Sequence, residues 1–381
     1  MSDTQKHIKP NVPTLRFPGF EGEWERIRLA YSCDVYDGTH QTPKYTKTGV
    51  PFLSVEDITA LRDVEKKYIS EEAFQRDFKI SPQKGDILMT RIGDIGTSIV
   101  IEENKPIAYY VSLALIRPHE IDSAFLNSYI ASPFFKRELY RRTIHVAFPK
   151  KINKEDIGEC LFTYPQVNEQ KKIGRFLALL DQRIDVQNKV IEKYESLIKA
   201  LYARLIPEDG DNHVALGTLV LICKGKQLNG EFLSDDGKYY VMNGGITPSG
   251  YYEEYNTPAG TISISEGGNS CGFVQYNEEP FWSGGHCYTL LQTRDERIQY
   301  KFLYHFLKSR QDEIMSLRIG SGLPNIQKKD IGKFTVPILP LDYQKAITRL
   351  FDSIGKRIEY EQTLLVELAL QKNYFLGSMF I

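Results

Sequence analysis

The second half of this chain repeats part of the first half at a nearly constant distance along the sequence. Residues 152–158 read Ile-Asn-Lys-Glu-Asp-Ile-Gly, and residues 326–332 read Ile-Gln-Lys-Lys-Asp-Ile-Gly, an offset of 174 residues (326 minus 152). Gln170-Lys171 and Arg183-Ile184 recur at that same offset as Gln344-Lys345 and Arg357-Ile358. Several ordered matches at one offset are hard to obtain by chance. A duplication constrains the fold strongly, because each copy must form the same kind of unit.

The two copies match unevenly along their length. Gly85–Thr90 corresponds loosely to Gly260–Ser265, and both segments have the pattern of a short buried strand after a turn. Phe125-Leu126 and Phe302-Leu303 each begin an apolar, helix-like stretch. The segments after these match best, so each copy holds one divergent globular region followed by one similar helical region. We infer that the two helical regions have the same function, whereas the two globular regions have two variants of one function. The alternative is an old duplication whose two copies diverged by random drift, although drift should not leave the helical segments selectively unchanged.

The first well-matched segment predicts a long helix from about Asn168 to Leu205, ended by Pro207 and Gly210. A second long helix follows Pro337 and Pro340. In both, apolar residues recur at alternating spacings of three and four, which is the pattern of a coiled coil. If a pseudo-two-fold axis relates the copies, the helices run antiparallel with the globular regions at opposite ends. The predicted contact line, which we call the seam, includes Leu177, Leu180, Ile184, Gln187, Ile191, Ile198, Phe351, Ile354, Ile358, Glu361 and Leu365.

The seam has one polar position in each helix, Gln187 and Glu361, at equivalent places in the repeat (361 minus 187 is 174). A buried polar residue at a seam position costs stability but specifies register and partner orientation. The alternative is that both residues face solvent at a helix edge.

Composition excludes several classes of protein without identifying one. Five cysteines are scattered without a C-x-x-C pair, so neither a disulfide framework nor a zinc site is indicated. The N-terminus lacks the apolar core of a signal peptide, and no apolar run approaches the roughly 20 residues of a membrane helix. We therefore expect a soluble cytoplasmic protein. The net charge of −1 neither supports nor excludes nucleic-acid binding, which needs a local basic surface.

The sequence contains none of the common catalytic signatures. It has no G-x-x-x-x-G-K-[ST] loop, no H-E-x-x-H and no G-x-S-x-G. The two motifs typical of adenine methyltransferases, F-x-G-x-G and [DN]-P-P-[YF], do not occur either. His286-Cys287 does not suggest a nucleophilic pair, because adjacent residues of a strand point to opposite faces. We expect no catalytic site and no metal ligands in this chain.

Polar loops in the first globular region suggest a nucleic-acid contact. The stretch from Asp37 to Tyr45 places hydroxyl, imidazole, amide and amino groups around turn-forming residues, which suits contacts to base edges or phosphates. Arg91, between a strand and a glycine turn, could bind guanine O6 and N7. The alternatives are a well-capped turn and a surface salt bridge. The candidate contacts are Thr39, His40, Gln41, Lys44, Tyr45 and Arg91.

The second globular region has glycine-rich turns that carry amide and hydroxyl groups. Glycine allows close backbone approach to a ligand, although hairpin geometry is the simpler reason for any single glycine. The candidate DNA contacts in this region are Lys224, Lys226, Asn243, Thr247, Asn269 and Ser270.

Together these features resemble the specificity subunit of a type I restriction–modification system, over nearly the whole chain. The resemblance rests on Pro165-x-x-x-x-Gln170-Lys171-Lys172-Ile173 running into Phe176-Leu177-x-x-Leu180-Asp181-x-x-Ile184. The opening Pro13-x-Leu15-Arg16-Phe17-Pro18-x-Phe20 with Trp24, and Asp37-Gly38-Thr39-His40-x-Thr42-Pro43, are also similar to that family. The second helix departs from the pattern, with Asp342-Tyr343 before Gln344 and Gly355 where the first helix has Asp181.

The resemblance implies an α+β fold with two globular mixed α/β target-recognition domains, separated by two long antiparallel coiled-coil helices in a pseudo-two-fold internal repeat. The expected domains are a flexible N-terminus (1–13), target-recognition domain 1 (14–165), a central helix (166–207), target-recognition domain 2 (208–338) and a C-terminal helix (339–381). Each target-recognition domain would read one half of a bipartite, asymmetric site in double-stranded DNA. The helices would set the unread spacer and dock two modification (methyltransferase) subunits.

Restriction (translocase and nuclease) subunits would join the same complex. S-adenosylmethionine, ATP and Mg²⁺ would belong to these partners, so this chain would bind no cofactor. The near-zero charge then suggests that partners supply part of the phosphate-binding surface. The competing interpretations are a coiled-coil adaptor with two protein- or carbohydrate-binding ends, and a fused modification–restriction enzyme, against which the missing methyltransferase motifs weigh.

Overall fold

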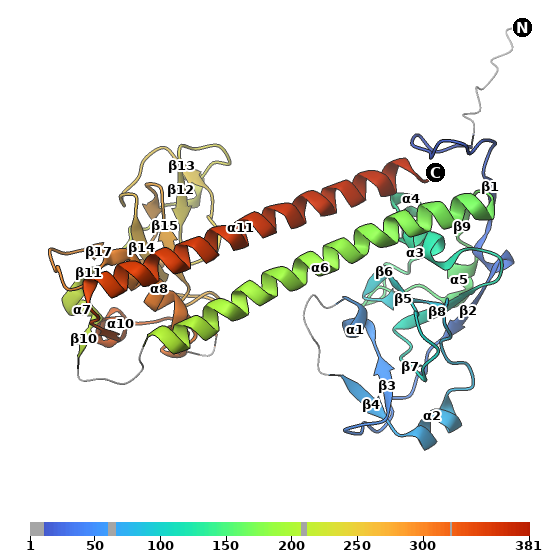
Figure 1. Ribbon diagram of the computed structural model, residues 1–381, viewed down its shortest axis with the longest axis horizontal. Helices are drawn as coiled ribbons and strands as arrows, with labels where there is room; N and C mark the ends of the chain where they lie inside the picture. Colours follow the sequence, from blue (N-terminus) through green and yellow to red (C-terminus); the bar gives the residue numbers. More distant parts are fainter. Residues whose placement is uncertain (1–10, 60–65, 207–211, 321) are drawn as a thin grey trace, which may run out of the picture. The chain divides into compact units, whose positions relative to one another are not determined.

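The computed structural model of the chain describes residues 11–59, 66–206, 212–320 and 322–381 (Figure 1). These residues form two compact units, Met1–Asn188 with Thr363–Ile381, and Lys189–Gln362. Each unit contains one globular region and a stretch of each of two long helices, α6 (Val167–Leu205) and α11 (Leu341–Ser378). Both predicted long helices are therefore confirmed. Residues 1–10 of the predicted flexible N-terminus, and the predicted helix terminators Pro207 and Gly210, lie outside the described residues.

The first unit is built around a four-stranded antiparallel sheet in the order β2–β8–β5–β6, with a three-stranded sheet (β4–β3–β7) and a two-stranded sheet (β1–β9) beside it in the same unit. Its strands are β1 (Glu25–Arg28), β2 (Cys33–Asp37), β3 (Val50–Leu53), β4 (Lys67–Ile69), β5 (Ile87–Ile92), β6 (Asp94–Val100), β7 (Ala108–Tyr109), β8 (Leu113–Pro118) and β9 (Leu161–Tyr164). Its shorter helices are η1 (Leu29–Tyr31), α1 (Val55–Thr59), α2 (Glu71–Asp77), α3 (Ser123–Ala131), α4 (Pro133–Arg142) and α5 (Lys154–Gly158).

The second unit has the same set of sheets. Its four-stranded sheet has the order β11–β17–β14–β15, its three-stranded sheet β13–β12–β16, and its two-stranded sheet β10–β18. Its strands are β10 (His213–Ala215), β11 (Val220–Lys224), β12 (Tyr239–Met242), β13 (Tyr251–Tyr252), β14 (Thr261–Ser265), β15 (Val274–Asn277), β16 (Trp282–Ser283), β17 (Cys287–Gln292) and β18 (Thr335–Pro337). Its shorter helices are α7 (Leu216–Leu219), η2 (Gly230–Phe232), α8 (Tyr300–Ser309), α9 (Gln311–Ser316) and α10 (Lys328–Lys333).

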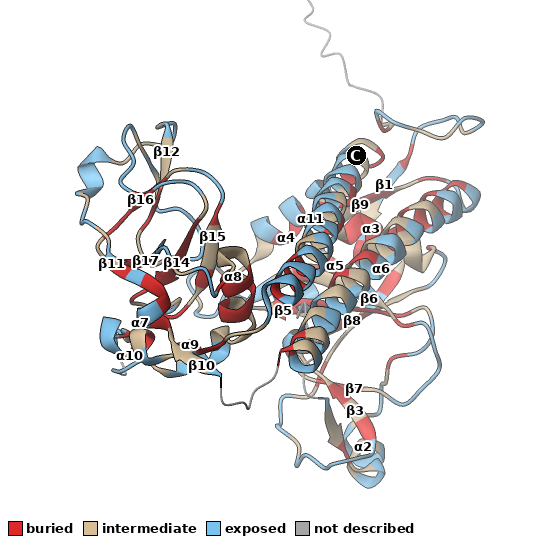
Figure 2. Cartoon of the chain, turned by 60° about the vertical axis from the view of Figure 1, so that its left-hand side comes forward, coloured by how far each residue is buried: buried red, intermediate tan, exposed pale blue. Residues whose placement is uncertain are grey.

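The internal repeat thus extends into the regions where the sequences diverge. In each three-stranded sheet the central strand pairs antiparallel with one neighbour and parallel with the other, β3 with β4 and β7, and β12 with β13 and β16. The buried strands expected at Gly85–Thr90 and Gly260–Ser265 are β5 and β14, with almost every residue buried (Figure 2). A buried strand needs apolar side chains but not particular ones, so its sequence can drift while its place in the sheet stays constant.

The two long helices pair antiparallel within each unit. In the first unit the rings of Phe176 and Phe375 meet edge to face with their centroids 4.9 Å apart. In the second unit the rings of Tyr202 and Phe351 stack with their centroids 4.0 Å apart. Each residue of the predicted seam is buried or half-buried, and the pairing along the seam stays a prediction.

The two polar seam residues are buried, so the interpretation in which they face solvent is wrong. Gln187 is 8% exposed and Glu361 is 4% exposed. Arg357 approaches Glu361 to 2.5 Å, which places a positive charge beside the buried carboxylate. Both residues therefore occupy the positions from which a polar group specifies helix register.

A buried glutamine explains why the Gln-Lys pair recurs at the start of each long helix. Gln170 accepts a hydrogen bond from the backbone N–H of Asp122 at 3.0 Å and donates to the carbonyl of Pro165 at 2.8 Å. Gln344 accepts from the N–H of Gln299 at 2.7 Å and donates to the carbonyls of Arg297 and Leu339. Each amide side chain satisfies backbone groups before α3 or α8, and this links the long helix to its globular region.

A buried histidine is expected to make the second unit sensitive to acid. His305 lies between the Tyr202 hydroxyl, at 3.2 Å, and Asp352, at 2.8 Å. Burial lowers the pKa of His305 from 6.5, with Asp352 opposing the shift. The unfolded chain therefore takes up the proton more readily, so this contribution to stability is complete above pH about 6.5 and decreases as the pH falls toward the lowered pKa. Urea unfolding between pH 7.5 and 5.5 checks this, and the variant H305Q should lose part of the acid sensitivity. An identical pH dependence in H305Q would contradict the assignment to His305.

Candidate nucleic-acid interface

Loops from several strands meet at one end of the four-stranded sheet in the first unit. Strands β2 and β5 run in the same direction, because each pairs antiparallel with β8 between them. Their carboxyl ends therefore lie at the same end of the sheet. We call this end, with residues 37–39, 91–93 and 110–112, the β2/β5 edge.

Arg91 lies at this edge but its guanidinium is not free. It is ion-paired with Asp37 at the end of β2, and its side chain is only 7% exposed. A shift in strand register between Met89 and Arg91 marks an irregularity just before it, of the kind that redirects a side chain. Burial lowers the pKa of Arg91, and the Glu155 carboxylate opposes the shift. The proposed contact of Arg91 with guanine therefore requires the ion pair to open.

Thr39 belongs to the framework of the edge. Its backbone N–H donates to the carbonyl of Tyr109, and its carbonyl accepts from Val111. Its hydroxyl accepts a hydrogen bond from the backbone N–H of Gln41 at 3.3 Å. This is the capped turn given above as the alternative to a DNA contact. The other candidate side chains in this loop are exposed: His40, Gln41, Lys44 and Tyr45.

Gly38 shows why this loop needs glycine. A Cβ atom on Gly38 would lie 2.4 Å from the carbonyl oxygen of Tyr110. The backbone passes against the neighbouring strand here, so only glycine fits between Asp37 and Thr39.

The second unit builds the equivalent end of its sheet from different residues. Strands β11 and β14 end together, on either side of β17, in a region that we call the β11/β14 edge (residues 224–227, 266–270 and 284–286). Glu266 accepts hydrogen bonds from Lys224 at 2.6 Å and from the Tyr288 hydroxyl at 2.9 Å through one oxygen. Its other oxygen lies 3.7 Å from Nδ1 of His286.

The two edges carry the same ion pair with the charges exchanged. Asp37 faces Ala114, which faces Met89 across the first sheet. Lys224 faces Tyr288, which faces Ile264, in the same positions of the second sheet. Arg91 and Glu266 lie two residues beyond Met89 and Ile264. One pair is therefore Asp37–Arg91 and the other is Lys224–Glu266.

The exchange determines which edge presents a cation. In the first unit the positive group is the buried Arg91 of the inner strand, whereas in the second it is Lys224 of the outer strand, whose side chain is 53% exposed. Lys224 can therefore contact a phosphate while it remains paired, and Arg91 cannot. Asp37 and Glu266 were not among the candidate contacts predicted from the sequence. Their partners, Arg91 and Lys224, lie on other strands and can be identified only once the strand register is known.

The remaining candidates in the second unit surround the same edge. Asn243 accepts a hydrogen bond from the backbone N–H of His286 at 3.1 Å. The backbone N–H of Lys226 donates to the carbonyl of Ser283, so its exposed side chain projects from an anchored position. Asn269 and Ser270 follow Glu266 in the next turn, and Thr247 is exposed on the loop after Asn243.

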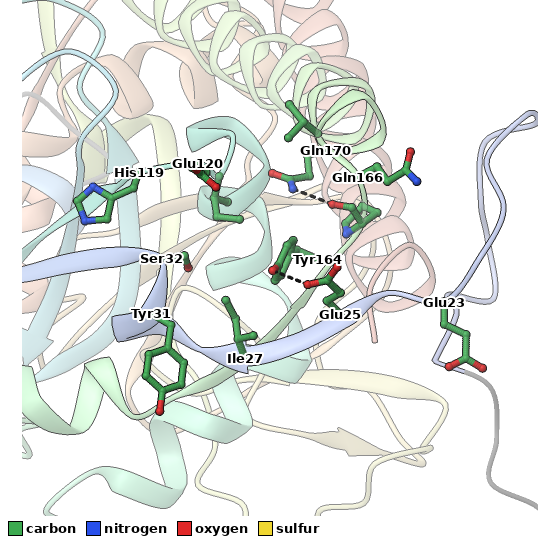
Figure 3. Close-up of a pocket in the computed structure, with 13 residues that line it drawn as sticks. Glu23, Glu25, Ile27, Tyr31, Ser32, His119, Glu120, Tyr164, Gln166 and Gln170 are labelled. Carbon is green, nitrogen blue, oxygen red and sulfur yellow. Dashed lines mark hydrogen bonds between the residues drawn. The ribbon is translucent and has the colours of Figure 1, made fainter.

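Charge distinguishes this end of the first sheet from the opposite end. Lys150 lies at the β2/β5 edge, because its carbonyl accepts from the N–H of Gly93, and Lys151 pairs with Ile92. Both lysines are exposed and form no ion pair with another described residue. At the opposite end a cavity of about 590 Å³ is lined by Glu23, Glu25 and Glu120 (Figure 3). The two exposed lysines therefore make the β2/β5 edge, which also carries Asp37 and Asp94, more favourable for a polyanion than the cavity with its three glutamates.

His286-Cys287 does not form a reactive pair. His286 is exposed, whereas Cys287 is buried, and burial raises the pKa of its thiol to about 11. The thiolate that a nucleophile requires is therefore scarce at neutral pH. Among the described residues, no group of His, Cys, Asp and Glu side chains is arranged to hold a metal ion, and no helix is long and apolar enough to cross a membrane.

Comparison with known proteins identifies the same family over both halves of the chain. The family model described as "Type I restriction modification DNA specificity domain" matches residues 22–196 and 210–370. A curated protein of Mycoplasma pneumoniae, named as a type I specificity subunit, is 36% identical over 151 residues, which are 39% of this chain and 40% of that protein. A protein of Methanocaldococcus jannaschii, named as the MjaX specificity subunit, is 22% identical over 89% of this chain and 88% of its own length.

The fold is also that of a solved structure. The crystal structure of the type I restriction–modification S subunit from M. genitalium superposes with a TM-score of 0.69 at 19% sequence identity, covering 97% of this chain and 99% of that one. The match to the M. pneumoniae protein spans less than half of that protein's length, so it defines similarity over that stretch only.

Proposed function

This chain belongs to the family of type I restriction modification DNA specificity proteins, and from that premise we propose that it is the sequence-recognition subunit of a type I restriction–modification complex. Each globular region reads one half of a bipartite, asymmetric DNA site. The chain itself performs no catalysis.

The observation that carries this proposal is that both units have the same arrangement of sheets but present different side chains at the equivalent edge. Both units have the same sheet order, and the loops at the β2/β5 and β11/β14 edges occupy equivalent places. The charged pair at these edges is Asp37–Arg91 in one unit and Lys224–Glu266 in the other. Base readout depends on the donors and acceptors that a loop presents, so two such edges suit two unrelated half-sites.

The paired helices are proposed to set the unread spacer and to dock two modification subunits. Figure 2 shows exposed stretches along both α6 and α11. Several of the exposed residues on these helices are large and apolar, which suits a protein partner better than DNA. They are Val167, Leu179, Val186, Val366, Leu370 and Tyr374 in the first unit, and Leu197, Leu341, Tyr343, Leu350 and Tyr360 in the second. Val186 and Tyr360 are equivalent in the repeat (360 minus 186 is 174).

The reactive chemistry is proposed to reside in the partners. Restriction subunits join the complex to cut DNA, and S-adenosylmethionine, ATP and Mg²⁺ bind to the partner subunits. The sequence supports this division, because it contains neither the methyltransferase motifs nor a phosphate-binding loop.

Methylome sequencing tests the proposal directly. A host that carries this chain with its cognate modification subunit should contain a bipartite methyladenine motif that is absent from the same host without this chain. Exchange of residues 208–338 for those of a relative should change one half of the motif and leave the other half unchanged. Unchanged methylation in both experiments would contradict DNA reading and favour the adaptor interpretation.

A further inference from the structure

A loop at the β2/β5 edge carries two apolar side chains that nothing covers. Residues 144–151 join α4 to the segment before α5, and the exposed fraction is 97% for Val146 and 104% for Phe148. Single exposed apolar residues are common on protein surfaces. Full exposure of a phenylalanine at the tip of an anchored loop, beside a candidate binding edge, is a stronger signal.

The base of this loop is attached to strand β5. Ile144 donates to the carbonyl of Lys151 at 2.7 Å and closes the loop. Gly93 donates to the carbonyl of Lys150 at 2.8 Å, and Ile152 donates to the carbonyl of Arg91 at 3.0 Å. The tip is therefore held at a defined place while its side chains stay free.

The second unit repeats this arrangement with an unrelated sequence. Ile319 donates to the carbonyl of Asn325, Gly268 to the carbonyl of Pro324, and Ile326 to the carbonyl of Glu266. These are the same three hydrogen bonds at equivalent positions. The apolar tip residue is now Leu323, which is 88% exposed. In both loops the exposed apolar residue directly precedes a proline, as Phe148-Pro149 and Leu323-Pro324.

Exposed cations and polar groups lie close to both apolar residues in the sequence. Lys150 and Lys151 follow Phe148-Pro149 and are exposed. In the sequence around Leu323 the exposed polar residues include Arg318, Asn325 and Lys328. An apolar tip among cations does not suit a membrane interior or an apolar protein groove, but it suits DNA, whose stacked bases lie between rows of phosphates.

We propose that the loop 144–151 and the segment 322–325 carry apolar wedges that insert Phe148 and Leu323 against the base stack, one in each half-site. The inference rests on the proposed DNA-reading function. Partial insertion of an apolar side chain unstacks one base step and kinks the duplex, which is easiest at flexible pyrimidine–purine steps. The neighbouring cations stabilise the bent backbone. The wedges would thus recognise the deformability of the DNA, in addition to the hydrogen-bond readout of bases by the β2/β5 and β11/β14 edges.

Base unstacking can be measured with 2-aminopurine, whose fluorescence rises when it loses its stacking neighbours. The probe is a duplex carrying the motif found by methylome sequencing, with 2-aminopurine placed singly through each half-site. The methylated adenine is avoided, because methyltransferases extrude their target base. The protein is the whole chain in complex with its cognate modification subunit.

We expect a fluorescence rise at one step in each half-site. F148A should abolish the rise in one half-site only, and L323A in the other, with each variant binding about 10-fold more weakly. The matched controls Y31A and L221A remove exposed side chains, 72% and 56% exposed, near the opposite ends of the same sheets and should leave both signals unchanged. Since all four side chains are exposed, unfolding temperatures should not change.

The possible outcomes separate the two proposals. Specific binding of the bipartite site with no rise, or with the same rise in F148A and L323A, would overturn the wedges and leave the proposed function intact. Failure of the wild-type complex to prefer its site over random DNA would overturn both. Loss of binding to the modification subunit in F148A would assign the loop to a protein contact instead.

Discussion

Arg91→Glu is expected to lower the free energy of unfolding of the first unit by about 3–5 kcal/mol, and adding Asp37→Lys is expected to restore more than half of that loss. The single substitution places a second carboxylate at the buried position 91, against the half-buried Asp37 and with Glu155 nearby. The double substitution recreates the Lys224–Glu266 arrangement that the second unit uses at the same positions. Chemical denaturation of the four members of this double-mutant cycle measures the coupling between the two sites.

The second unit supplies the matched control. Lys224 is half-exposed, so its solvation in water offsets much of the loss when its partner is changed. Glu266→Arg should therefore destabilise the second unit less than Arg91→Glu destabilises the first. Strictly additive effects of Asp37→Lys and Arg91→Glu would show that the two residues do not act as a pair.

Gly174→Ala should destabilise the first unit by roughly 1–3 kcal/mol, although alanine is the better helix former. Gly174 lies on α6 where it crosses the start of α3. A Cβ atom there would lie 2.5 Å from the backbone nitrogen of Phe125 and 2.8 Å from a carboxylate oxygen of Asp122. Asp122 caps α3 by accepting from the N–H of Phe125, so the added methyl group would separate the helix from its globular region.

Gly355→Ala in the other long helix should have the opposite effect. Apart from the adjoining residues and backbone of its own helix, no atom lies within 4 Å of the position of its Cβ, so the main change is the loss of backbone freedom in the unfolded chain. We expect a gain of about 0.5–1 kcal/mol, measured as a higher unfolding temperature of the second unit. A stabilising effect of Gly174→Ala would show that α6 can move away from α3 at little cost.

The sequence was sufficient for features that depend on neighbours along the chain. Helix α6 follows from a periodicity that any amphipathic helix must satisfy, and the same periodicity predicts the seam with its polar positions Gln187 and Glu361. The strands β5 and β14 followed from the repeat together with short apolar runs after turns. These patterns are local, so they can be recognised without knowing what packs against them.

The partners of individual polar residues required the tertiary structure. Arg91 could be interpreted as a base contact or as half of a salt bridge, and only the sheet places it beside Asp37, two strands away. The burial of Gln187 and Glu361 was likewise undecided until the second helix was in place.

The sequence by itself determined that the chain is duplicated, that long helices follow its globular regions, and which family it resembles. Only the tertiary structure decided which side chains meet at the two edges, that their charges are exchanged, and that Phe148 and Leu323 project from equivalent anchored loops. The physical reason is that the periodicity of a helix or strand depends only on the spacing of apolar residues within one segment. An ion pair or an exposed loop tip depends on strand register and on what other segments leave uncovered.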